Sequence, residues 1–375
     1  MKRTYDVFVD NGLFVLSYYL KKPIEDITEN DIINNIDLIC NKIYEFVECE
    51  KYSNLKSMMF PNSALTQTSS DKTINDYLKV FSNSKGEDVC KCCGKNRTNI
   101  KTEGLHRSYL PNYVANPFYN FSNNFMGVNV CGICSILTMF SILNARVYGL
   151  AYLYNSDNDD FMYDYTEEIQ EENKKDILLK AKKDKDNKIT NTNLIENLLN
   201  NNKIYDGYIQ IYRFNNSGQS QDIDVQDINS DNLKLLSKIV NNNLLKEFKE
   251  NNLMINLLKN NIENTYVNKI IKNDELKCSR ELFDFLNMEV NKLSEDIKNI
   301  IFNICDKLKD EDTRKIRNKL KLINSFKDFE RFVVELGDNY SDTHEDKLYS
   351  RDEYLIIDNR IKYNQIKNLM IVSLM

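Results

Sequence analysis

Two pairs of cysteines with Cys-x-x-Cys spacing constrain the fold of this chain more than any other feature. Gly94 follows the first pair and Gly132 lies inside the second, so each pair has a glycine where a tight turn needs conformational freedom. Four thiolates at this spacing are the ligand set of a closed, tetrahedral zinc site. The sequence therefore predicts that one structural Zn²⁺ ion joins two segments of the chain. The predicted ligands are Cys90, Cys93, Cys131 and Cys134.

The other cysteines bear on two alternatives to a zinc site. A redox Cys-x-x-Cys motif or a disulfide framework would also use paired cysteines, but the total of nine is odd. The remaining cysteines are scattered as ordinary buried thiols are, so structural zinc is the favoured interpretation. Cys92 lies beside Cys93 and is a candidate replacement ligand. The cysteines outside the two pairs are Cys40, Cys49, Cys92, Cys278 and Cys305.

Length and composition indicate a soluble globular protein with two domains. The chain has 375 residues, of which 42% are hydrophobic, which is adequate for a packed core. Charged residues interrupt the apolar ones near the N-terminus, so we expect no signal peptide and a cytoplasmic location. The most apolar stretch, residues 130–143, is interrupted by hydroxyl side chains and is too short to span a membrane. We expect it to form a buried helix that begins at the second cysteine pair.

Residues 1–225 are predicted to form a mixed N-terminal α/β domain, which contains the zinc-binding insertion at about 86–135. Tyrosine-, isoleucine- and leucine-rich segments predict strands, and apolar residues at helical spacing predict helices. The charged segment 155–193 is interpreted as a solvated excursion. The predicted strands cover 5–9, 146–154 and 204–214, an apolar core stretch covers 13–20, and the predicted helices cover 29–47 and 74–81.

Residues 226–375 are predicted to form a C-terminal helical bundle. The preceding segment, 215–230, is rich in Gly, Ser, Asn and Asp and is interpreted as the connection between the domains. Beyond it, Leu, Ile and Lys recur at helical spacing. The predicted fold class is therefore α+β, with an α/β domain followed by a bundle. The predicted helices cover 231–249, 253–272, 278–309, 311–321 and 327–336, with a final segment from 354.

The zinc segment combines cations with aromatic residues. Residues 86–150 carry a net positive charge, whereas the whole chain has a net charge of −6, so any contact with a polyanion is expected to be local. Cations beside aromatic rings suit phosphates and bases. The alternative is that the aromatic residues fill a small core around the metal. The candidate nucleic-acid-binding residues here are Lys95, Arg97, Lys101 and Arg107.

A second basic run lies in the predicted bundle. Ile316, Leu320 and Ile323 share one face of the predicted helix, and five cations within eight residues flank that face. These cations are candidates for tracking a phosphate backbone. They are equally compatible with a solvated face whose long side chains cover apolar surface. The cations are Arg314, Lys315, Arg317, Lys319 and Lys321.

Groups typical of catalysis are few. The chain has two histidines, and no phosphate-binding glycine loop or nucleophile elbow is visible. His106 lies between the cysteine pairs, where small ββα-metal (HNH-like) nucleases carry a catalytic histidine. Its neighbours, Leu105 and Arg107, are not metal ligands, so a structural or nucleic-acid-facing role is favoured. His344 lies in a polar run and is expected to be solvated.

Several motifs together resemble the CXXC-CXXC family of CRISPR-associated proteins, which is the large subunit of type I-B Cascade effector complexes. The resemblance covers the N-terminal half best, including residues 120–127 before the second cysteine pair. It implies zinc ligation by the four cysteines. The other motifs are Phe8-Val9-Asp10-Asn11-Gly12, the apolar stretch 13–20, and Ile27-Thr28-Glu29-Asn30-Asp31.

The resemblance implies a function in antiviral defence without catalysis by this chain. The large subunit of such complexes reads the short motif that flanks the target on double-stranded DNA, contacts the guide RNA and other Cascade subunits, and recruits a helicase-nuclease. The C-terminal bundle then corresponds in character to the small subunit. In such systems base pairing with the guide RNA recognises the long target sequence, so the protein needs only local contacts to the short flanking motif. A zinc-braced HNH-like nuclease and a generic zinc-stabilised interaction protein remain as alternatives.

Overall fold

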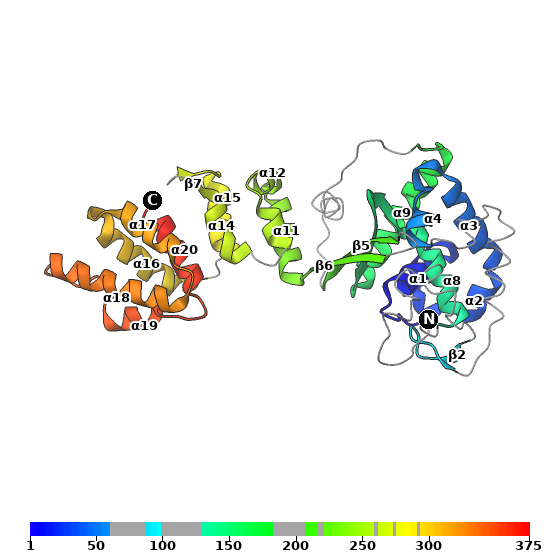
Figure 1. Cartoon of the computed structure of the whole chain (residues 1–375), viewed down its shortest axis with the longest axis horizontal. Helices are drawn as coiled ribbons and strands as arrows, with labels where there is room; N and C mark the ends of the chain where they lie inside the picture. Colours follow the sequence, from blue (N-terminus) through cyan, green and yellow to red (C-terminus); the bar gives the residue numbers. More distant parts are fainter. Residues whose placement is uncertain are drawn as a thin grey trace. The chain divides into compact units, whose positions relative to one another are not determined.

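A computed structural model shows a mostly helical chain, with a four-stranded antiparallel sheet in its N-terminal part and helices in its C-terminal part (Figure 1). The predicted α+β fold class is confirmed. The chain divides into two compact units, Met1–Leu233 and Lys234–Met375, whereas the sequence placed the boundary between residues 225 and 226. The structure describes residues 1–60, 88–98, 130–182, 207–216, 221–258, 262–272, 275–290 and 293–375.

The N-terminal unit begins with helix α1 (Val7–Leu20), so the strand predicted over residues 5–9 is wrong. Asp6 is the N-cap, and its side chain accepts hydrogen bonds from the backbone N–H groups of Phe8 and Val9. The alternation that suggested a strand runs directly into continuous apolar residues. A single buried helix places both sets of residues in one core, which an isolated strand could not do.

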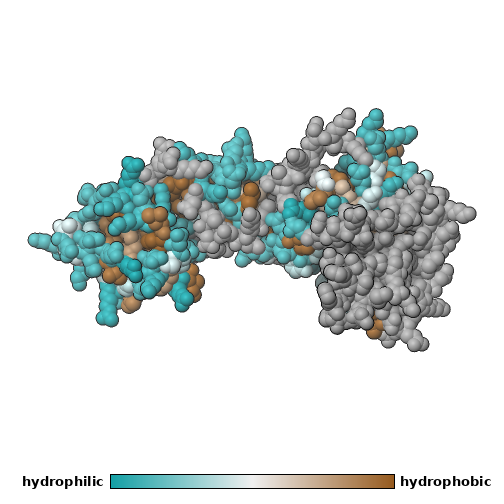
Figure 2. All heavy atoms as spheres, viewed as in Figure 1, coloured by the Kyte–Doolittle hydropathy of each residue, from teal (hydrophilic) through white to brown (hydrophobic). Residues whose placement is uncertain are grey.

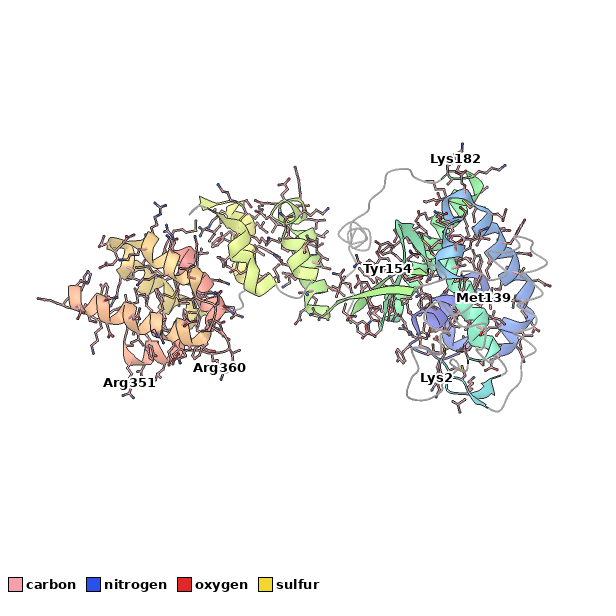
Figure 3. The ribbon with its side chains drawn as sticks, in the orientation of Figure 1. Lys2, Met139, Tyr154, Lys182, Arg351 and Arg360 are labelled. Atoms are coloured by element: carbon pink, nitrogen blue, oxygen red, sulfur yellow. The ribbon has the colours of Figure 1, made fainter. Side chains whose placement is uncertain are left out.

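Helix α1 packs against helix α8 (Gly132–Phe140), which begins at the second cysteine pair. At Gly12 an added Cβ atom would lie 1.8 Å from the backbone oxygen of Leu137, so only glycine fits this contact. Met139 of α8 lies inside the unit (Figure 3). Helix α8 is buried along its whole length, which confirms the buried helix predicted within residues 130–143.

Helices α2 (Glu29–Asn34) and α3 (Ile36–Glu48) confirm the helical pattern predicted over residues 29–47. Thr28 and Asp31 form a reciprocal capping box at the start of α2. The helix predicted over residues 74–81 lies outside the described residues. Three short helices complete this region: η1 (Ile24–Asp26), η2 (Glu50–Tyr52) and α4 (Leu55–Met59).

The main sheet has four antiparallel strands in the order β3-β4-β5-β6. Gly149, with φ at 79°, forms the turn between β3 and β4, so the strand predicted over 146–154 is a hairpin. Strand β5 confirms the strand predicted within 204–214, of which 204–206 are outside the described residues. The strands are β3 (Arg146–Tyr148), β4 (Leu150–Ser156), β5 (Ile209–Asn216) and β6 (Gln221–Ile228).

Strand β6 corrects the prediction that residues 215–230 connect two domains. It pairs with β5 in continuous register, from Ile209 opposite Ile228 to Asn216 opposite Gln221. β6 is an edge strand, and Asp224, Val225 and Asp227 are exposed on it. Because an edge strand pairs on one side only and carries polar side chains, its sequence resembles that of a loop.

Residues 155–193 were predicted to be a solvated excursion, but most of the described ones form helix α9 (Asp159–Leu178). Asn158 caps it by accepting a hydrogen bond from the N–H of Phe161. One face carries buried apolar and tyrosine side chains, and the acidic and basic residues that dominate its composition lie on the other. Residues 183–193 are outside the described residues. The buried apolar and tyrosine side chains are Phe161, Met162, Tyr165 and Ile169.

A buried hydrogen-bond network joins α1, α9 and the short helix η4 (Ser141–Asn144) that continues α8. The Asn144 amide donates to Asn11 Oδ1 at 3.0 Å and accepts from Gln170 Nε2 at 2.9 Å. The Asn11 amide donates to the carbonyl of Tyr154 on β4 at 2.9 Å. Satisfied polar networks of this kind fix one arrangement of the elements around them, here including α8 and the cysteines at its start.

The C-terminal part consists of helices, as predicted, but most of the long predicted helices are divided into shorter ones. Asn243 and Asn252 have positive φ values of 58° and 55° and end helices α11 and α12. Among the described residues, no helix combines the length and apolar character that a membrane crossing requires. The first helices are α11 (Ser230–Asn241), α12 (Leu245–Glu250), α13 (Leu253–Leu258), α14 (Ile262–Ile270) and α15 (Arg280–Glu289).

The last helices of the chain surround helix α20, which packs against α14, α16 and α17. Their buried side chains include Ile301, Leu320, Phe329 and Ile366, so this unit has an apolar core of its own. The elements are α16 (Glu295–Lys307), η5 (Leu308–Asp310), α17 (Thr313–Leu322), α18 (Phe326–Thr343), α19 (Arg351–Ile357) and α20 (Tyr363–Ser373).

Candidate metal centre

The four predicted cysteines converge in the N-terminal unit. Cys90 follows strand β1 (Asp88–Val89), and Cys93 precedes the antiparallel partner strand β2 (Asn96–Thr98). Cys131 is the N-cap of α8, and Cys134 lies in the first turn of that helix. Their sulfur atoms all lie within 4.8 Å of one another, and only Cys93 is partly exposed. The predicted convergence of the two pairs is confirmed.

The backbone of the first pair forms a tight turn. The N–H of Gly94 donates to the carbonyl of Cys90 at 2.9 Å, and the N–H of Cys90 donates to the carbonyl of Lys95 at 2.8 Å. Gly94 has φ at 70°, which explains why glycine occupies this position. Because glycine adopts this conformation readily, the turn orients the sulfur atoms of Cys90 and Cys93 without backbone strain.

Backbone N–H groups also point at the sulfur atoms. The N–H of Cys131 donates to Cys90 Sγ at 3.3 Å, and the N–H of Cys134 donates to Cys131 Sγ at 3.5 Å. Both donors belong to the start of α8, where the N–H groups of a helix lack partners and favour negative charge. The arrangement suits sulfur atoms in the thiolate form, which is the form that binds metal ions.

The spacing of the sulfur atoms fits one four-coordinate ion. A tetrahedron with metal–sulfur bonds of about 2.3 Å has sulfur–sulfur edges of about 3.8 Å. Cys93 Sγ and Cys131 Sγ are 3.8 Å apart, whereas a disulfide bond would bring two sulfur atoms to about 2 Å. None of the nine cysteines forms a disulfide bond. The cluster is therefore a candidate metal centre and not a disulfide framework.

The thiols interact strongly with one another. Hydrogen bonding to Cys131 lowers the pKa of Cys93 to about 7 and lowers the pKa of Cys90 below its usual range. Hydrogen bonding to the same residue raises the pKa of Cys134 well above its usual value. The shared hydrogen bonds thus favour the thiolate form at some sulfur atoms over their neighbours. A divalent cation would favour the thiolate form at all four, and its binding would release protons.

Cys92 is not part of the four-sulfur cluster. Its sulfur lies 3.9 Å from Oδ2 of Asp6, the N-cap of α1. On the other side of the turn, Lys95 Nζ forms an ion pair of 2.6 Å with Glu29 of α2. The turn that carries the first cysteine pair is therefore attached to the starts of both α1 and α2.

The residues predicted to contact nucleic acid are divided between the two units. Lys95 is exposed beside the cysteine cluster, and Arg97 lies in β2. Lys101 and Arg107 lie outside the described residues. Arg314, Lys315, Lys319 and Lys321 belong to α17 in the C-terminal unit. The described members of the two predicted groups therefore belong to different units.

Arg317 does not lie on the exposed cationic face predicted for this helix. Only 8% of it is exposed, and its guanidinium donates a hydrogen bond to the carbonyl of Leu374, near the end of α20. The long side chain thus reaches into the core of the C-terminal unit. Helical periodicity places Arg317 at the edge of the apolar face. A side chain at that edge can be buried or exposed, so the sequence could not decide between the two.

His344 is the histidine that the structure describes, and it does not belong to the cysteine cluster. His344, which was expected to be solvated, is partly exposed and lies at the end of α18. Its ring stacks on that of Tyr340 with the ring centroids 4.1 Å apart, and its Nδ1 atom lies 3.2 Å from the Tyr340 carbonyl in the last turn of the helix. His106 lies outside the described residues.

The fold and the site define an α+β protein in which a four-cysteine centre joins a short β-hairpin to a buried helix. Comparisons with protein-family models, with curated proteins and with solved structures found no match for the chain. The resemblance to the CXXC-CXXC family therefore depends on the motifs alone. What the structure adds is that the four cysteines of those motifs lie together.

Proposed function

We propose that the cysteine centre binds one Zn²⁺ ion with a structural role. Thiolates select soft or borderline metal ions, and four-coordinate sulfur sites in proteins hold zinc or iron. Zinc has no redox chemistry and accepts this geometry without distortion. Four cysteine ligands fill the coordination of a tetrahedral ion, so no position remains for a water molecule or a substrate. The ion would hold the hairpin β1–β2 and helix α8 in place and would take no part in a reaction.

We further propose that the chain is the non-catalytic large subunit of a type I-B CRISPR Cascade complex. The observation that carries this proposal is that three motifs on which the resemblance depends meet in space. Helix α1 contains Asp10-Asn11-Gly12, and Glu29 belongs to the second motif at the start of α2. The turn that carries the first cysteine pair contacts the N-cap of α1 through Cys92 and Asp6, and the start of α2 through the Lys95–Glu29 ion pair.

This convergence supports the family proposal because the motifs are separated by many residues in the sequence. The second cysteine pair begins the helix that packs against Gly12, so it belongs to the same assembly. The motifs therefore share one core, as is expected if they belong to one family pattern. In the proposed function this core presents a surface that reads the motif flanking the target on double-stranded DNA.

The charge of the protein is compatible with such a role. The chain has a net charge of −6, so it does not coat nucleic acid by bulk electrostatics. In a guide-RNA complex, base pairing reads most of the target and the protein reads a short duplex motif. Lys95 and Arg97 at the cysteine centre are the described residues that we propose for such a local contact. Other Cascade subunits, the guide RNA and a recruited helicase-nuclease are the proposed partners.

The test is purification of the tagged full-length chain from its native cells, followed by sequencing of bound RNA and mass spectrometry of bound proteins. We expect guide RNA that carries CRISPR repeat sequence, together with several CRISPR-associated proteins. The purified complex should bind a duplex with the correct flanking motif and should lose this preference when the motif is changed. A chain that purifies without RNA and without such proteins contradicts the proposal.

A nuclease assay separates this function from the HNH-like alternative. The isolated chain is incubated with duplex and single-stranded DNA and Mg²⁺ or Mn²⁺, beside the variant His106→Ala. We expect no cleavage by either protein. Metal-dependent cleavage that is lost in His106→Ala would instead establish the nuclease.

A further inference from the structure

A groove of about 380 Å³ lies between α17 and α18 in the C-terminal unit, within the size range of ligand-binding pockets. The two helices are consecutive in sequence, and each packs against α20. Figure 2 shows apolar atoms among hydrophilic ones on the surface of this unit. The floor of the groove is apolar and is formed by Leu308, Ile316, Phe332, Leu336 and Tyr340.

The two walls of the groove carry opposite charges that do not neutralise each other. Lys315 and Lys319 line it from α17, and Glu335 and Asp342 line it from α18. None of these four side chains forms an ion pair within the described part of the chain. Elsewhere in the unit, exposed charges are commonly paired, as in Lys307–Asp346 at 2.8 Å and Lys298–Glu295 at 2.8 Å.

We propose that this groove binds an amphipathic α-helix of a partner protein. Its apolar residues at positions i, i+3 or i+4 and i+7 would fill the floor. Acidic residues on one flank of the helix would face Lys315 and Lys319, and basic residues on the other flank would face Glu335 and Asp342. The apolar floor thus determines the class of ligand, and the unpaired charges on the walls determine its charge pattern.

The charges also argue against the other occupants. Glu311 and Asp312 line the end of the groove where α17 begins, so carboxylates outnumber lysines there and would repel a nucleic acid. The lining residues extend along both helices, from Asp312 to Lys319 and from Phe332 to Thr343, which suits an elongated ligand. This interaction is independent of the proposed role in Cascade, because it uses neither the cysteine centre nor the residues beside it.

The test uses the full-length chain and a synthetic probe of known composition. The probe is a fluorescein-labelled helical peptide of about 15 residues. It carries a leucine stripe at i, i+3, i+4 and i+7, glutamate on one flank and lysine on the other. Binding is measured by fluorescence anisotropy in physiological salt. We expect saturable binding that weakens about tenfold in Glu335→Lys and about tenfold in Lys319→Glu, since each change opposes one flank of the peptide.

Asp338→Lys is the matched control, because Asp338 is exposed on α18 but does not line the groove. It makes the same charge change as Glu335→Lys and should leave the affinity within about twofold. Hydrogen exchange should show that the peptide protects α17 and α18. Three results would each overturn the proposal: no binding at millimolar peptide, equal losses in Glu335→Lys and Asp338→Lys, or protection confined to the N-terminal unit.

Sedimentation of the chain without peptide tests occupancy by a second copy. We expect a concentration-independent sedimentation coefficient. Self-association that is abolished by both Glu335→Lys and Lys319→Glu would assign the groove to a second copy of the chain and would contradict the partner helix.

Discussion

At the scale of single residues, neighbouring cysteines have different surroundings that define different roles. Cys134 is fully buried in the first turn of α8, among three other sulfur atoms. Cys92 is adjacent to Cys93 in the sequence but lies next to Asp6. The turn between the paired cysteines orients alternate side chains in different directions. A replacement of Cys134 and a replacement of Cys92 should therefore have distinct consequences.

Cys134→Ser should abolish stoichiometric metal binding, because a serine hydroxyl is a poor ligand for a thiolate-selective ion. We expect the zinc content to fall from about one ion per chain to less than half of that, and the melting temperature of the N-terminal unit to fall by about 10 °C. Elemental analysis by mass spectrometry and calorimetry measure the two effects.

Cys92→Ser is the control for this experiment, since it removes the thiol that lies outside the cluster. It should keep full zinc content and change the melting temperature by no more than about 3 °C. Loss of zinc from Cys92→Ser and its retention by Cys134→Ser would show that the ligand set has been assigned incorrectly.

The sequence predicted the ligands but not the groups around them. Cysteine spacing is a direct consequence of coordination geometry, so Cys90, Cys93, Cys131 and Cys134 were identifiable without a structure. The N–H groups that point at the sulfur atoms belong to backbone, and backbone has no sequence signature. The contact between Cys92 and Asp6 joins residues 86 positions apart, which no local pattern reveals.

At the scale of elements, the position of α8 depends on its close contact with α1. Gly12 places the backbone of α1 against the backbone oxygen of Leu137. The hydrogen bond from the Asn144 amide to Asn11 Oδ1 holds α1 against η4, the short helix that continues α8. Since Cys131 and Cys134 lie at the start of α8, the packing of the two helices also places half of the ligand set.

Gly12→Ala should disrupt this contact, because the added Cβ atom would overlap a backbone oxygen that no side-chain rotation can move. We expect a loss of about 3 kcal/mol in the free energy of unfolding of the N-terminal unit, seen as a fall in its melting temperature.

Gly337→Ala in α18 is the matched control. Its Cβ atom would meet the hydroxyl of Tyr349 at 2.3 Å, which is the end of a side chain that can rotate away. The displaced hydrogen bond from Tyr349 to the Val333 carbonyl is partly offset by the higher helix propensity of alanine. The change should remain below about 1.5 kcal/mol. Equal losses in the two variants would contradict the tight contact at Gly12.

Sequence patterns predicted an element well where most of its residues are apolar and buried, and poorly where a mostly polar segment buries only a few residues. Helix α8 is apolar throughout and was predicted correctly. The sequence predicts a solvated excursion where α9 lies and a connection between domains where β6 lies, because polar and charged residues outnumber the apolar ones in both segments. Helix α1 was divided into a strand and a core stretch, because alternation over five residues fits a short strand as well as a helix.

At the scale of the whole molecule, the protein consists of two units with separate apolar cores. The cysteine centre lies in the first unit, Met1–Leu233. The second unit, Lys234–Met375, is held by packing around α20 and has no cluster of metal-binding side chains among its described residues. Metal binding should therefore affect the stability of the two units unequally.

Removal of the metal with a chelator should lower the melting temperature of the N-terminal unit by about 10 °C or more. The reason is that the free energy of metal binding stabilises only the folded unit, in which the four ligands are brought together. The transition of the C-terminal unit should move by less than about 2 °C. Differential scanning calorimetry of the full-length chain, before and after chelation, provides the measurement. Restoration by added Zn²⁺ is the control, and equal shifts in both transitions would contradict the assignment.

The anchoring of Cys93 and Cys131 to a common centre has a practical consequence for the connecting chain between them. The two cysteines are 38 positions apart in the sequence, and their sulfur atoms are neighbours in the cluster. An ion bound there would close the chain between them into a loop, and removal of the ion would open that loop at its base.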